Sequence, residues 1–142
     1  MDARSTPEEA ARGDLPEDYS RALATSISPD GQYAAVLLGT NAIPFLYSYL
    51  VICERTPEGW TEGSGVSGDG AGWHSTTMPD ESQPNVGVFT LDGEAPIDAR
   101  EAVVMWRGKE TTIPVAHGYY LFAAWDISES DMREWPTLVR FL

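Results

Sequence analysis

The sequence predicts an all-β protein, a single antiparallel β-sandwich with an immunoglobulin-like texture, and three observations carry this prediction. About eight short segments are rich in apolar, β-branched and aromatic residues. Turn residues separate them at spacings near the roughly 8–12 residues typical of sandwiches and barrels. No segment shows the apolar period of an amphipathic helix. A closed β-barrel is the alternative that the same pattern allows.

Residues 20–40 predict the first hairpin. Residues 20–28 alternate polar and apolar side chains at period two, which is typical of a strand. The turn Pro29-Asp30-Gly31 follows, because proline presets φ and glycine accepts a positive φ. Residues 32–40 are then the returning strand.

The remaining strands follow from apolar content and from proline. Residues 45–55 carry apolar side chains on both faces, which predicts a central strand covered on both sides. Pro114 has no backbone N–H to donate, so residues 111–115 are expected at a sheet edge or a bulge. The other expected strands are short and rich in apolar and aromatic residues: residues 60–62, 86–91, 102–107, 119–126 and 137–142.

The length of 142 residues predicts one domain. Residues 1–18 carry six acidic residues and two arginines with little to bury, so we expect a mobile N-terminal arm before a single domain at 19–142. One helical turn is expected after Thr6, which can cap it, with Pro7 at the first helical position.

A glycine-rich stretch, GSGVSGDGAGW, opens what we expect to be a long loop over residues 63–85. Its first six letters satisfy the dinucleotide pattern G-x-G-x-x-G. However, Gly68 is followed by Asp-Gly-Ala-Gly, which cannot open the helix that binds a pyrophosphate. A loop of this length is usually functional or disordered. Because Trp73 and His74 lie at its centre, we favour function over disorder.

The candidate binding residues therefore come from this loop and from neighbouring aromatics: Asp69, Trp73, His74, Trp60, Tyr119 and Tyr120. The alternative for Trp73 is structural, with the indole folded back to cap the core while the glycines let the backbone approach.

No catalytic residue, metal site or cofactor is expected. Cys53 lies on an expected buried strand, where a thiol behaves as an inert apolar group. It is the single cysteine, so no internal disulfide forms. His74 and His117 lack the spacing of metal-ligand pairs.

The formal charge of −13, from 22 acidic and 9 basic residues, disfavours nucleic acid and anionic membrane surfaces as partners. The spread of the charge along the sequence is typical of a soluble protein, and the alternative interpretation is a basic protein partner or mimicry of nucleic acid. The polar N-terminus does not resemble a signal peptide, and no apolar run approaches the roughly 20 residues of a membrane helix. We expect a cytoplasmic protein.

The segments SPDGQYAAVLLGTN, LDGEAP, VVMWRGKETTIPV and HGYYLFAAWDI together resemble small, uncharacterised all-β proteins of actinobacteria. The resemblance implies one β-rich domain and no catalytic residue.

Two function hypotheses follow. The first is a non-enzymatic protein-interaction module, such as an immunity, inhibitor or accessory protein for a basic partner. The second is a β-barrel or sandwich that binds a small molecule in an aromatic-lined pocket. The oligomeric state stays open.

Overall fold

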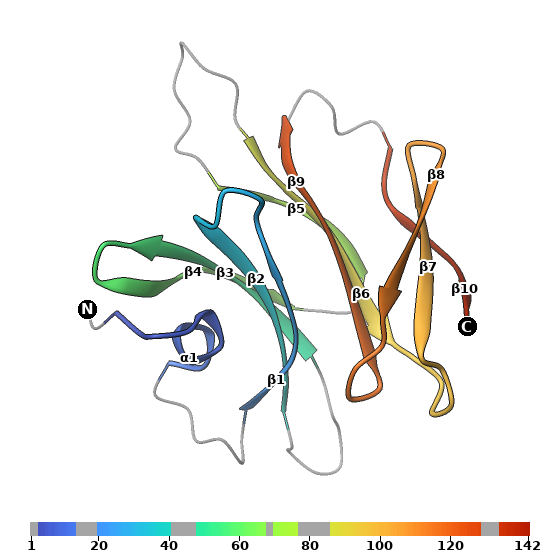
Figure 1. Ribbon diagram of the computed structural model, residues 1–142, viewed down its shortest axis with the longest axis horizontal. Coiled ribbons are helices and arrows are strands. Elements are labelled where there is room, and N and C mark those ends of the chain that lie inside the picture. Colours follow the sequence, from blue (N-terminus) through green and yellow to red (C-terminus); the bar gives the residue numbers. More distant parts are fainter. Residues whose placement is uncertain (1–2, 14–19, 41–47, 68–69, 77–85, 129–133) are drawn as a thin grey trace. The chain divides into compact units, whose positions relative to one another are not determined.

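Antiparallel strands joined by short turns make up most of the chain (Figure 1). The structure, a computed structural model, contains one helix and ten strands among the residues it describes. Their contacts group the chain into two units, residues 1–68 and 69–142. The described residues are 3–13, 20–40, 48–67, 70–76, 86–128 and 134–142.

Unit 1 is a four-stranded antiparallel sheet in the order β1-β2-β3-β4, so each strand lies beside its neighbour in sequence. The first turn forms as the sequence predicts, with Gly31 at φ 74 and the backbone N–H of Ser28 bonded to the carbonyl of Tyr33 at 2.8 Å. The elements are α1 (Pro7–Arg12), β1 (Ser20–Ile27), β2 (Tyr33–Thr40), β3 (Ser48–Thr56) and β4 (Gly59–Ser67).

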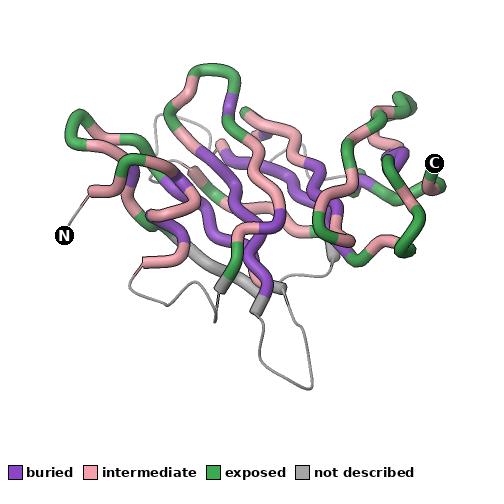
Figure 2. Tube along the Cα trace, turned by 60° about the horizontal axis from the view of Figure 1, so that its bottom comes forward, coloured by how far each residue is buried: buried purple, intermediate pink, exposed green. Residues whose placement is uncertain are grey.

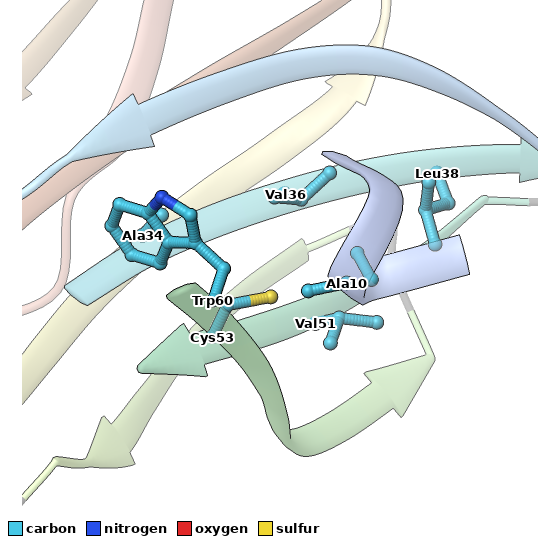
Figure 3. Close-up of a cluster of buried hydrophobic side chains, with 8 residues drawn as sticks. Ala10, Ala34, Val36, Leu38, Val51, Cys53 and Trp60 are labelled. Atoms are coloured by element: carbon cyan, nitrogen blue, oxygen red, sulfur yellow. The ribbon is translucent and has the colours of Figure 1, made fainter. Parts of the chain in front are cut away.

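The core of unit 1 lies between α1 and the sheet (Figure 3). Two small helix residues, Ala10 and Ala11, let the helix backbone approach the strands closely, and both are at most 4% exposed. Branched, aromatic and small residues from three strands fill the remainder: Ala34, Val36, Leu38, Val51, Cys53 and Trp60.

The N-terminal segment differs from the mobile arm that the sequence predicts. Thr6 caps α1, its hydroxyl accepting from the backbone N–H of Glu9 at 3.2 Å, and Pro7 stands at the start, both as expected. The helix is nevertheless packed on the sheet, and the Oγ1 of Thr25 donates to Glu8 at 2.6 Å. The prediction missed this because two alanines supply the buried surface, and alanine gives little apolar signal in an acidic sequence.

Unit 2 consists of two three-stranded antiparallel sheets, ordered β5-β6-β9 and β10-β7-β8. Tight turns join β7 to β8 at Arg107-Gly108 and precede β9 at His117-Gly118, with positive φ at all four residues. The strands are β5 (Gly70–Ser75), β6 (Val86–Glu94), β7 (Glu101–Trp106), β8 (Lys109–Pro114), β9 (Tyr119–Ser128) and β10 (Thr137–Phe141).

The two sheets of unit 2 enclose an aromatic core. Tyr120 of β9 meets Phe141 of β10 edge to face, with ring centroids 5.8 Å apart. Phe89 of β6 lies 5.9 Å from Trp106 of β7. Facing aromatic pairs of this kind stabilise a core beyond their buried area. Further residues of both sheets complete it: Leu91, Ala102, Val104, Phe122, Ile113 and Ala124.

The all-β prediction is confirmed, and no sheet of the described residues closes into a barrel. The expected strands are present wherever the structure describes them, and Pro114 lies on β8, an edge strand, as predicted. Figure 2 shows buried residues along the middles of strands and exposed residues at the hairpin turns. No helix in the described parts of the chain has the length and apolar character needed to cross a membrane.

The contacts group the chain into two units that divide after Gly68, and one domain over 19–142 stays a prediction. The expectation of a loop over 63–85 is corrected, because β4 extends to Ser67 and β5 occupies Gly70–Ser75. Glycine weakens the strand pattern of a sequence, but Gly65, Gly70 and Gly72 are each paired with a residue of a neighbouring strand. Residues 68–69 and 77–85 lie outside the described residues.

Candidate binding edge

Strand β5 forms one edge of its sheet and pairs with β6 in an unbroken register from Gly70 opposite Asp92 to Ser75 opposite Gly87. Just beyond the strand, the backbone N–H of Thr76 donates to the carbonyl of Val86 at 2.9 Å. Bonded pairs alternate along an antiparallel ladder. The groups of Gly72 and His74 therefore point toward β6, and those of Ala71 and Trp73 point away from it.

The side chain of Trp73 attaches this edge to the sheet. Its indole crosses β6 at Gly87, and Nε1 donates to the carbonyl of Ile127 on β9 at 3.2 Å. Position 87 requires glycine, because a β-carbon there would collide with the backbone oxygen of His74 and would also lie 2.9 Å from Cε2 of Trp73. Trp73 is half-buried. One side chain therefore connects all three strands and determines where the outer backbone groups of β5 stand.

His74 occupies the opposite face of β5, where its Nε2 lies 3.2 Å from Oγ1 of Thr90 on β6. Burial lowers the pKa of His74 below its ordinary value of 6.5, because desolvation disfavours the charged ring. The imidazole is thus neutral at neutral pH. A neutral ring with a hydroxyl partner stabilises the β5–β6 pair and leaves the strand without charge.

Three other edge strands are interrupted by β-bulges, which twist an edge and disrupt pairing with a further strand. The register of β1 with β2 shifts at Leu23, and that of β10 with β7 shifts at Val139. In β9 two residues, Trp125 and Asp126, stand opposite one residue of β6, and Asp126 has φ 60.

The last two edges are protected by a bulge, a covering segment, charge or proline. The β3–β4 register shifts between Val51 and Cys53, and Arg4 makes two backbone hydrogen bonds to Trp60 on the outer side of β4, at 2.7 and 2.8 Å. Strand β8 begins with the charged pair Lys109-Glu110 and ends with a proline. Both devices are known to block edge-to-edge pairing.

Strand β5 is the exception among these six edges. Its sequence, GAGWHS, contains no charged residue and no proline, and its register has no shift. Ala71 is exposed, so the outer side of the strand is accessible beside it. A regular edge whose backbone groups point away from the sheet, as those of Ala71 and Trp73 do, is a template for an additional strand.

The candidate binding residues lie on different strands and differ in burial. Trp60 is 7% exposed in the core of unit 1, and Tyr120 is 6% exposed in the core of unit 2. Tyr119 is half-buried at the start of β9. Trp73 and His74 lie on β5, and Asp69 lies outside the described residues.

Sequence reasoning missed Ala71, whose outward backbone marks the edge most clearly. Alanine between two glycines gives no strand signal, and the weak alternation of GAGWHS was interpreted as part of a loop. Only the lack of certain residues could have identified the edge from the sequence, since β5 has neither the proline nor the charged residues of β8.

Other chemistry is limited among the described residues. Burial raises the pKa of the Cys53 thiol to about 12, and the nearby carboxylates Glu62 and Glu8 add to this, so the reactive thiolate does not form near neutral pH. The described residues contain no group of three or more histidine, cysteine or carboxylate side chains placed to hold a metal ion. A cleft of about 290 Å³ is lined by Glu8, Glu9, Arg12, Arg21 and Ala22, without the aromatic rings of the small-molecule hypothesis.

Comparison with family models, with curated proteins and with solved structures found no match to this chain. The function is therefore argued from the β5 edge itself.

Proposed function

We propose that this chain is a non-enzymatic protein-interaction module that binds an extended segment of a protein partner along β5. The observation that carries the proposal is the contrast among the six sheet edges of the described strands: five are bulged, covered or charged, whereas β5 has an unbroken register and carries no charge and no proline. Edges that native proteins leave regular and uncharged are the ones to which strands add.

The attachment of β5 supports the same function. An added strand binds more tightly to a template that is already ordered, because less conformational entropy is lost. Trp73 provides this order by its hydrogen bond to Ile127 across Gly87. The edge is thus held in place from its inner side while its outer backbone groups remain directed away from β6.

The test uses a proline that removes one outward N–H. In the variant Ala71→Pro this donor is lost, whereas the bonds of Gly72 and His74 to β6 are retained. Thr112→Pro on β8 is the matched control. The backbone N–H of Val115 donates to the Arg100 carbonyl on the β7 side, so the alternation of the ladder places the N–H of Thr112 on the outer side of β8. Thr112 is exposed as Ala71 is.

Peptides are selected from a displayed random library on the wild-type chain, and their affinities are then measured for each variant. We expect Ala71→Pro to weaken binding by at least about tenfold, and Thr112→Pro to leave it unchanged. The proposal fails if no peptide is enriched, or if the enriched peptides bind Ala71→Pro as tightly as they bind the wild type.

A further inference from the structure

We infer that the segment added to β5 is positively charged, an extended stretch in which lysine or arginine alternates with uncharged residues. This inference rests on the proposed function, since it names the partner of the same edge. Strand β5 itself does not discriminate between positively and negatively charged partners, because none of its six residues is charged at neutral pH. The selection comes from the charge of the surrounding chain and from the shape of the strand.

Both units of the chain are acidic. Residues 69–142 include twelve aspartates and glutamates against five lysines and arginines, and residues 1–68 include ten against four. An approaching segment therefore meets a negative potential at either unit. Potentials of this kind accelerate the encounter with a partner of opposite charge and slow the encounter with one of like charge.

The side chains of β5 suit long basic residues. Gly70, Ala71 and Gly72 leave the first half of the strand almost without side chains. The aliphatic stems of lysine and arginine can lie along such a surface while their charged ends stay in water. In the second half, Trp73 directs its indole across β6 toward Ile127, away from the outer edge, so it places no bulk beside an added strand.

A second copy of the chain fits this edge less well. Each copy carries a formal charge of −13, so pairing β5 with β5 brings two strongly acidic bodies together. Repulsion between them opposes association, and screening by salt reduces it only partly at close approach. A basic segment of another protein has the opposite sign, and its attraction adds to the backbone hydrogen bonds.

Three synthetic peptides test the inference. Each is about ten residues long, near the length of a long strand, and alternates threonine or valine with one variable residue: lysine, glutamine or glutamate. Binding to the full chain is measured by fluorescence anisotropy at about 50 mM and about 300 mM salt. The variants Ala71→Pro and Thr112→Pro are measured in parallel.

We expect the lysine peptide to bind at least about tenfold more tightly than the glutamine peptide, and the glutamate peptide to bind most weakly. Binding of the lysine peptide should weaken several-fold at the higher salt concentration. It should be lost in Ala71→Pro and retained in Thr112→Pro.

The failures of the two proposals are distinguishable. If the three peptides bind equally and all depend on Ala71, strand addition stands and the inference of a basic partner is wrong. If the lysine peptide binds Ala71→Pro as well as the wild type, the attraction is general to the acidic surface, and both proposals fail at this edge. Sedimentation equilibrium tests whether a second copy of the chain occupies the edge. If the wild type is a dimer and Ala71→Pro is a monomer, the edge binds a second copy and the inference of a basic partner is wrong.

Discussion

Strands β5 and β8 occupy equivalent places in unit 2, and their sequences differ in one respect that matters for function. Each has six residues and forms the edge of a three-stranded antiparallel sheet. In KETTIP the edge carries two charges and a proline, and the register directs Pro114 outward, where no N–H is needed. The sequence GAGWHS has no charged residue and no proline, and its register with β6 has no shift. Edge strands of equal length thus differ in the side chains that disfavour pairing with a further strand.

The difference shows where such a small fold can place an interaction. A sheet edge needs no pocket and no catalytic group to bind, because the backbone supplies the hydrogen bonds. The sequence must then provide only an anchored strand that has no charge, proline or bulge to block pairing with a further strand. In this chain Trp73 anchors β5, and the residues on either side of it provide the rest.

The largest effect should come from the anchor. Trp73→Ala removes the indole packing over Gly87 and the hydrogen bond to Ile127, and we expect the free energy of unfolding to fall by about 2–4 kcal/mol. Urea denaturation followed by circular dichroism measures it. The control Trp73→Phe keeps most of the packing and should lose about 1 kcal/mol. An unchanged stability in Trp73→Ala would mean that the indole does not hold the edge.

A smaller effect concerns His74, the second side chain that joins β5 to β6. Burial lowers its pKa in the folded chain below 6.5, so the unfolded chain binds a proton first as the pH falls. The stabilising contribution is therefore complete above pH 6.5 and is lost as the pH decreases through the folded-state pKa. Denaturation curves of the wild type and His74→Gln, recorded at several pH values, should diverge below pH 6.5. Parallel curves would contradict the assignment.

The smallest effect should come from the charges that protect β8. The Nη1 of Arg140 lies 2.7 Å from Oε1 of Glu110, but the two side chains are 52% and 40% exposed. Exposed ion pairs contribute little, so Arg140→Ala should change stability by less than about 1 kcal/mol. The same denaturation assay applies. A larger loss would show that this charge serves stability as well as protection of the edge.

Much of the fold could be predicted from the sequence. Turn residues such as Pro29 and Gly31, and the strand alternation around them, are local signals that need no tertiary information. Pro114 indicated an edge for the same reason, since its missing N–H is a property of the residue. Only local chemistry is required for these assignments.

The candidate site could be predicted only in part, because its features depend on distant residues. Trp73 was singled out as an unusual aromatic, but its role depends on Gly87 and Ile127, which follow it by 14 and 54 residues. The aromatics Trp60 and Tyr120, named among the candidate binding residues, are buried. Whether an aromatic faces a core or solvent depends on which strands pair, and composition does not encode that.

The central claim is that the outer backbone groups of β5 are open, and amide hydrogen exchange tests it most directly. In the free protein, the amides of Ala71 and Trp73 should exchange rapidly, while those of Gly72 and His74, bonded to β6, should be protected. Addition of the lysine peptide should protect Ala71 and Trp73 as well. If all four amides are already protected in the free protein, the edge is closed and the proposed function is wrong.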